Sequence, residues 1–147
     1  MDPPVAAGVR PGTPGDFPAI ASLLLASGLP LDGLSADRPF AVVAIRDDRL
    51  VGCAHLERYG SHALLRSVAV DPAARRTGLG RRLVEAAIAG AAGHATRVYL
   101  LTETAAGFFG RLGFRRTPRS GVPGPVLASV EFTSACPASA TAMTRSL

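Results

Sequence analysis

The stretch VAVDPAARRTGLGRRLVEAA, residues 68–87, decides the fold because it joins a strand pattern to a helix pattern. The apolar run that leads into it reads as a strand over 64–71. From Gly78 to Ala92 the apolar residues recur at every fourth position, as on one face of a helix. The apolar positions of this predicted helix are Leu79, Leu83, Ala87 and Ala91.

The junction between strand and helix has the features of an anion site. A helix N-terminus leaves its first backbone N–H groups without partners and carries about half a positive charge. Gly78 and Gly80 allow a ligand to come close to the backbone, and Thr77 adds a hydroxyl. The flanking arginines are Arg75, Arg76, Arg81 and Arg82. This arrangement predicts a diphosphate site; the alternative is a helix capped by Thr77, whose glycines only make a turn.

Length and composition indicate one domain. The chain has 147 residues, of which 48% are hydrophobic, and this suits a single domain over 6–147 with a loose start at 1–5. No apolar run reaches the roughly 18 residues of a membrane span. The first residues also lack the basic start of a signal peptide. We therefore predict a cytoplasmic protein that has no membrane partner.

The charged residues exclude several kinds of chemistry. All 16 basic residues are Arg, the net charge is +5, and the chain has no Lys, Asn or Gln. Without Lys there is no Schiff base and no Walker-type phosphate loop. Without Asn and Gln there is no side-chain amide to read adenine. The arginines are scattered in short pairs, which disfavours nucleic-acid binding and favours a small polyanionic ligand.

Metal binding is not predicted. Cys53 and Cys136 lie far apart without CxxC spacing, which is typical of two buried thiols. His55 and His62 flank a predicted turn but lack a nearby third ligand.

The remaining patterns complete the order β-α-β-β-β-α-β-α-β. Strands are predicted at 8–11, 40–46, 50–58, 62–71, 97–103 and within 139–147, and helices at 14–30, 79–92 and 104–114. Asp16 is expected to cap the first helix, and Gly28 and Pro30 to end it. Three consecutive strands between residues 40 and 71 predict an antiparallel meander. The predicted fold class is α/β, with a mixed, mostly antiparallel sheet flanked by helices.

These residues resemble the acetyl-CoA motif of the GNAT superfamily of N-acetyltransferases, whose signature is Arg/Gln-x-x-Gly-x-Gly/Ala. Arg75, Gly78 and Gly80 occupy its positions. The run AAGFFGRLGF, residues 105–114, is similar to the second landmark of the family, a short helix that ends in Gly-Phe. Since the element order matches too, the resemblance covers nearly the whole chain. The runs LLRSVAV, YLLTET and EFTSACPASATAM further resemble a bacterial branch of arsenic-resistance N-acetyltransferases.

The resemblance implies an enzyme that uses acetyl-CoA and releases coenzyme A. In that fold the strands at 64–71 and 97–103 splay apart around the thioester, and residues 75–81 hold the diphosphate. The implied cofactor-binding residues are Val68, Ala69, Val70, Arg75, Arg76, Thr77, Gly78, Leu79, Gly80, Arg81, Phe108 and Phe109. Two of them depart from the family pattern. Arg76 stands where many members have Gly, and Phe109 where many have a Tyr that reprotonates the leaving thiolate.

Acetyl transfer requires a neutral amine, and an alkyl ammonium has a pKa of roughly 10, so a carboxylate base is expected. Glu57 is the preferred base because its strand position looks inward, and Glu103, at the end of the strand 97–103, is the second candidate. A solvated charge at a strand end is the alternative for each. Glu85 is expected to pair with Arg81 one helical turn before it. Glu131 has no predicted place.

Arg66 interrupts an apolar strand, so it is predicted to bind an acidic group with its guanidinium. The alternative is an arginine on the solvent face. Ser67 and Thr102 are the other substrate-binding candidates. An acceptor with both an amine and an acid would be an amino acid or an organoarsenical analogue of one.

The predicted function is direct acetylation of such a small-molecule amine. An acetyl-CoA-binding regulatory module without turnover and a protein or peptide N-acetyltransferase are the alternatives. The habit of the family makes a homodimer the expected assembly.

Overall fold

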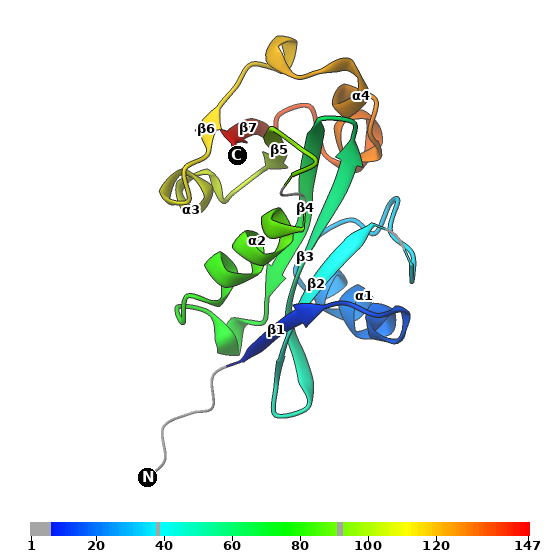
Figure 1. Ribbon diagram of the computed structural model, residues 1–147. Helices are drawn as coiled ribbons and strands as arrows, with labels where there is room; N and C mark the ends of the chain where they lie inside the picture. The colour runs from blue at the N-terminus through cyan, green and yellow to red at the C-terminus, as the bar shows by residue number, and fades with distance from the viewer. Residues whose placement is uncertain (1–6, 38, 91–92) are drawn as a thin grey trace.

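The computed structural model describes residues 7–37, 39–90 and 93–147, and its centre is a seven-stranded sheet (Figure 1). The strands are β1 (Gly8–Pro11), β2 (Phe40–Arg46), β3 (Arg49–Tyr59), β4 (His62–Val70), β5 (Arg97–Thr102), β6 (Arg115–Arg116) and β7 (Thr141–Ser146). They lie in the order β1-β2-β3-β4-β5-β7-β6. All neighbours are antiparallel except β4 and β5, which confirms the predicted fold class and the meander β2-β3-β4.

Helices cover both faces of this sheet. They are α1 (Phe17–Ala26), α2 (Leu79–Ala89), α3 (Ala106–Arg111) and α4 (Gly124–Leu127). One apolar cluster joins α2 and α3 to the sheet, while separate clusters join α1 and α4 to it from the other side. Within the described residues, none of the helices combines the length and the apolarity needed to cross a bilayer. The predicted loose start at 1–5 and the predicted helical position of Ala91 lie outside the described residues.

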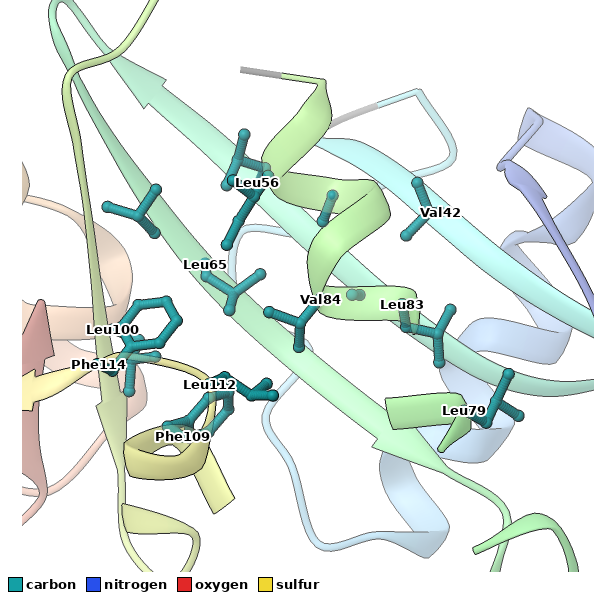
Figure 2. Close-up of a cluster of buried hydrophobic side chains, with 14 of the residues drawn as sticks. Val42, Leu56, Leu65, Leu79, Leu83, Val84, Leu100, Phe109, Leu112 and Phe114 are labelled. Atoms are coloured by element: carbon teal, nitrogen blue, oxygen red, sulfur yellow. The ribbon is translucent and has the colours of Figure 1, made fainter. Parts of the chain in front are cut away.

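The predicted apolar stripe of the second long helix is the main packing surface of the fold. Leu79 and Leu83 lie along α2 above the sheet, with Val42 and Leu65 among the strand residues beneath them (Figure 2). Leu83 is fully buried. Burial of one such side chain contributes about 1.5–3 kcal/mol. The stripe therefore fixes where the start of α2 lies relative to β4.

The strands β4 and β5 pair only at their beginnings. Their parallel ladder consists of His62 with Arg97, Ala63 with Val98 and Leu64 with Tyr99. Beyond Leu64 the two strands separate, as the family resemblance implied. The separation leaves one edge of β4 open over 65–70, next to the start of α2.

Two predicted polar contacts differ from those in the structure. The Asp16 carboxylate accepts hydrogen bonds from Thr13 N (2.7 Å) and Arg10 Nη1 (2.8 Å). It accepts none from the first N–H groups of α1, because a short 3-10 turn at Pro14–Asp16 precedes the helix. The carboxylate of Glu85 pairs with Arg145 Nη1 (2.8 Å), not with Arg81. In both cases the acidic side chain contacts a residue outside the helix instead of the predicted partner within it.

Candidate active site

A cleft of about 820 Å³ opens where β4 and β5 separate. Its walls come from 65–70 of β4, from the turn and first residues of α2, and from the end of β5 with the following turn and α3. The connection after α1 and the segment after α4 complete it, through Ser27–Pro30, Glu131 and Cys136. The cleft therefore reaches from the α2 side of the sheet to the side that α1 and α4 cover.

The α2 end of the cleft is built around two glycines. Gly78 precedes α2 and has a φ of +79°, a left-handed conformation that favours glycine, and a Cβ there would point into open space. At Gly80 a Cβ would lie 3.1 Å from Cζ of Phe108, so the ring packs against the bare backbone. Because the two glycines have no side chains, a diphosphate can reach the backbone N–H groups at this helix N-terminus directly.

Three of the four predicted arginines surround this turn. Arg75, Arg76 and Arg81 are exposed and line the cleft. Arg82 does not, since its Nη1 donates to the carbonyl oxygen of Ala7 (2.8 Å) and so ties α2 to the residue before β1. Thr77 does not line the cleft either. Its hydroxyl donates to the carbonyl oxygen of Ala74 (2.7 Å) and closes the turn before α2.

The structure brings the other predicted cofactor-binding residues together along the cleft. They are Val68, Ala69, Val70, Leu79, Phe108 and Phe109. Phe109 is buried between Phe108 and Phe114, with ring centroids 5.0 and 5.8 Å away in edge-to-face geometry. Its position therefore supplies apolar packing and no exchangeable proton.

Ser67 makes a bulge in β4 at the middle of the cleft wall. Cys53 pairs with Ala69 and His55 with Arg66, so the two residues between Arg66 and Ala69 face a single residue of β3. Ser67 has a φ of +54°, which is left-handed and costly for a residue with a side chain. Its carbonyl oxygen accepts from Nδ1 of His55 (3.2 Å) and lies 3.5 Å from Sγ of Cys53. These two buried donors, both on β3, stabilise the bulge.

The buried ring of His55 makes the free energy of unfolding depend on pH. Burial lowers the pKa of His55 from an ordinary value of 6.5 to about 4, so the folded protein keeps the ring neutral at neutral pH. As the pH falls from 6.5 to about 4, the unfolded chain binds a proton at this ring that the folded chain does not. We expect the free energy of unfolding to fall by roughly 3 kcal/mol across that window. Urea unfolding at both pH values measures the difference.

His55→Gln should be less stable at pH 7 and should lose most of this pH dependence. His94→Gln, at an exposed position, is the control and should keep it. Parallel stability curves for the wild type and His55→Gln would contradict the assignment.

Arg66 lies at the other end of the cleft and is buried rather than solvent-facing. Its side chain is 0% exposed. Nε lies 3.1 Å from Oε1 of Glu131 and 3.0 Å from Oγ of Ser67, and Nη1 lies 3.4 Å from Oε2 of Glu57. Tyr59 donates to the other oxygen of Glu57 (2.8 Å). Nη2 has no hydrogen-bond partner among the described residues.

The two predicted bases have different environments. Glu57 is not among the residues that line the cleft; its carboxylate is held by Arg66 and Tyr59. Glu103 lines the cleft and is exposed. Thr102 also lines it, and its Oγ1 accepts from the backbone N–H of Ala105 (3.0 Å), which fixes the turn that carries Glu103.

Glu131 and Cys136 complete this end of the cleft and were not predicted there. The thiol of Cys136 donates to Oε2 of Glu131 (2.6 Å). Burial and then Glu131 raise the pKa of this thiol to about 12, so it remains a neutral donor. Both residues belong to an irregular segment without strand or helix periodicity. The one available signal was that Glu131 is an acidic residue inside the mostly apolar run 126–132.

Comparison with known proteins agrees with this geometry. The family model for the acetyltransferase (GNAT) domain matches residues 37–116, more than half of the chain. The matched region contains β2 to α3, and therefore the open edge of β4 and the turn before α2. A comparison with curated proteins gave no match.

Several solved structures share the fold. N-acetylglutamate synthase from Neisseria gonorrhoeae, complexed with coenzyme A and N-acetyl-glutamate, is 22% identical with a TM-score of 0.81. That match covers 97% of this chain but only 35% of the synthase chain. Rv2747 from Mycobacterium tuberculosis, in complex with CoA and NLQ, is 24% identical over 95% of this chain and 99% of that one, with a TM-score of 0.78.

A third structure, the GNAT family N-acetyltransferase YhbS from Escherichia coli in complex with CoA, is 25% identical. It covers 78% of this chain and 72% of that chain, with a TM-score of 0.61. The family model and the cleft geometry lead to the same assignment. The chain therefore belongs to the GNAT family of acetyltransferases.

Proposed function

We propose that this acetyltransferase transfers the acetyl group directly to the amine of a small molecule bound beside Glu103 and Glu131. One observation carries the proposal. A single continuous cleft contains the glycine turn before α2 at one end and carboxylates at the other. Donor and acceptor can therefore be held together, and this proximity supplies much of the rate enhancement of a two-substrate reaction.

The residues of the chain have separable tasks in this proposal. Acetyl-CoA, when bound, supplies an activated thioester carbonyl. The turn at 75–81 holds the diphosphate through backbone N–H groups and the guanidinium groups of Arg75, Arg76 and Arg81. The unpaired edge of β4 over 65–70 offers backbone hydrogen-bonding groups to the extended arm. The bulge at Ser67 sets which of these groups face the cleft.

We propose Glu103 as the group that accepts the proton of the acceptor ammonium. It is exposed inside the cleft, whereas Glu57 lies outside the lining and is engaged by Arg66 and Tyr59. A carboxylate that must take up a proton in each turnover needs access to the acceptor and to solvent. Glu103 meets both conditions, and Glu57 serves as a partner of Arg66.

The acceptor is proposed to be a metabolite-sized amine. An amino acid or an organoarsenical analogue was predicted because Arg66 was expected to be free for an acid group. N-acetylglutamate synthase, of similar fold, is known in complex with N-acetyl-glutamate, which keeps an amino acid among the candidates. The engagement of Arg66 by two glutamates removes the original reason for that choice. A homodimer stays a prediction.

The proposal is tested by release of free coenzyme A thiol with a panel of small amines. We expect turnover with at least one amine class, and we expect Glu103→Gln to lower kcat about 10²-fold at neutral pH. Part of that loss should be recovered at high pH, where the amine is already neutral. Glu57→Gln is the control and should leave the shape of the pH profile unchanged. Only slow hydrolysis with every amine, or equal profiles for the two variants, would contradict the proposal.

A further inference from the structure

An arginine outside the cleft connects the sheet to the segment after α4, residues 128–140, which covers the amine end of the cleft. Resting on the proposed function, we propose that Arg119 is a positioning residue for the acceptor amine. Arg119 does not line the cleft itself. It acts through the segment that carries Glu131 and Cys136, both of which line the cleft. The place in which Arg119 holds this segment then determines how well an amine is bound.

A single nitrogen of Arg119 contacts three backbone carbonyl groups of the segment. Nη2 donates to the carbonyl oxygens of Pro137 (3.3 Å), Ala138 (3.2 Å) and Ala140 (3.2 Å). Since Nη2 carries two N–H groups, at least one of them is shared between two carbonyls. Among the described residues, no carboxylate forms an ion pair with Arg119. Its polar contacts are therefore made with the backbone of the segment.

The face of the same guanidinium lies over the ring of Phe132. Cζ of Arg119 is 5.4 Å from the ring centroid, within the range of a cation–π contact. Phe132 is buried and directly follows Glu131 in the chain. Arg119 therefore contacts the segment on both sides of Cys136, at residue 132 and again at residues 137–140.

The backbone just before Arg119 is anchored to the sheet. Arg119 follows β6, which pairs with β7 through Thr144 and Met143. The backbone N–H of Thr117 then donates to the carbonyl oxygen of Ala142 (2.9 Å). Because β7 pairs with β5 along its whole length, this anchor belongs to the same strand pair that leads to the end of β5 at the cleft. Arg119 can therefore hold the segment in a set place relative to the cleft.

Contacts inside the segment carry this position to the lining of the cleft. The backbone N–H of Cys136 donates to the carbonyl oxygen of Glu131 (3.1 Å), and the thiol donates to Oε2 of the same residue (2.6 Å). These two contacts join residues 131–136 into one compact turn. Arg66 holds the turn through Glu131, at 3.1 Å, and Arg119 holds it through Phe132 and the carbonyls after Cys136. Without Arg119, these carbonyls lose their donor and the wall of the cleft is no longer fixed.

The reacting groups are held independently of Arg119. Glu103 is proposed to accept the proton of the ammonium, and its turn is fixed by the contact between Thr102 and Ala105. The glycine turn before α2 lies at the other end of the cleft. Loss of Arg119 should therefore weaken binding of the amine and leave the chemical step and coenzyme A binding in place. A loss of binding that affects ground state and transition state alike raises KM at an unchanged kcat.

Arg119→Met in the full chain tests the inference, and Arg116→Met is the matched control. Arg116 is exposed on β6 and does not line the cleft. Release of coenzyme A is followed with 2-phenylethylamine, glycinamide and glutamate as acceptors. We expect Arg119→Met to raise KM for the amine about tenfold, with kcat and the calorimetric Kd for coenzyme A within about twofold of the wild type. Arg116→Met should change none of the three.

The thiol of Cys136 provides a readout that needs no acceptor. It is half-buried and donates to Glu131, and its pKa is raised to about 12, so it should react slowly with iodoacetamide. Cys53 is fully buried and should stay unmodified in every folded variant. We expect Arg119→Met to speed alkylation of Cys136 about tenfold, as located by mass spectrometry, because the segment opens more often. Arg116→Met should react at the rate of the wild type.

Arg119→Lys shows whether the donated hydrogen bonds matter. Lysine keeps a cation and has three N–H donors on one nitrogen, so it should recover part of the KM and part of the slow alkylation. A lysine variant no better than a folded Arg119→Met would contradict the role of these hydrogen bonds. If Arg119→Met does not fold, Arg119→Lys is measured in its place, and wild-type values of both KM and alkylation rate would then overturn the inference.

The two readouts separate this inference from the proposed function. Turnover with a wild-type KM in Arg119→Met, or a matching loss of coenzyme A affinity, would overturn the inference and leave the function standing. Faster alkylation in Arg119→Met, with no coenzyme A released by any amine in the wild type, would overturn the proposed function and still support the role of Arg119 in holding the segment.

Discussion

Replacing Arg66 by methionine is expected to lower the free energy of unfolding by about 3–5 kcal/mol. Methionine fills a similar volume, so the change mainly removes the positive charge. Glu131, which is buried, and Glu57, which is partly buried, then both lose the cation that they contact. One carboxylate must take up a proton or draw in water for the protein to stay folded. Urea unfolding at pH 7 measures the loss.

The same cluster supplies the controls. The triple variant Arg66→Met, Glu57→Gln and Glu131→Gln removes all three charges and should recover most of the lost stability, because no uncompensated charge remains. Arg10→Met breaks an even shorter ion pair, 2.8 Å to Asp16, but at the surface, where water screens the charges. It should cost far less than Arg66→Met. Similar losses for the two single variants would refute the view that burial sets the cost.

Gly78→Glu should weaken acetyl-CoA binding about 100-fold or more. The new carboxylate would stand at the turn where the diphosphate is proposed to lie, and a like charge in such a place costs several kcal/mol. The backbone there has a φ of +79°, but a Cβ meets no atom within 4 Å, so the side chain has room. Calorimetry with coenzyme A reports the loss directly, without need of an amine.

Gly60→Glu separates the charge from the backbone strain. Gly60 has a similar φ of +65° and equally open surroundings, but it lies in the turn between β3 and β4, at the far end of β4 from the cleft. It should lower stability to a similar extent and leave coenzyme A affinity unchanged. If Gly78→Glu binds coenzyme A normally, the diphosphate is held elsewhere.

Local sequence patterns were sufficient for the parts of the molecule that depend on near neighbours. The apolar runs divided by turns in 40–71 and the period of about four after Gly78 predicted the meander and α2. The glycine turn was predicted because it lies between the last strand of the meander and α2. These features are determined within about twenty residues, so a single sequence contains the information needed.

The acceptor end could not be predicted in the same way. Glu131 reaches Arg66 from 65 residues later in the chain, through a segment of short helical turns whose path depends on packing against the sheet. Glu85 likewise prefers Arg145, 60 residues away, to the arginine one turn before it on its own helix. The spacing of apolar residues along the chain gives no information about contacts between residues so far apart in the sequence. The prediction of Glu57 as the base was made without knowledge of these contacts.

One end of the cleft is formed by a continuous stretch of sequence, and the other end is covered by two segments that lie far apart in the sequence. The end that is proposed to bind coenzyme A belongs to the continuous unit of β4, the glycine turn and α2, whereas the end that is proposed to bind the amine is covered by the connection after α1 and the segment after α4. Changes in these two coverings leave the strand-to-helix unit untouched. After a gene duplication, changes confined to these two covering segments can therefore give an enzyme that acetylates different amines. Such an enzyme would keep the same strand, turn and helix for binding coenzyme A.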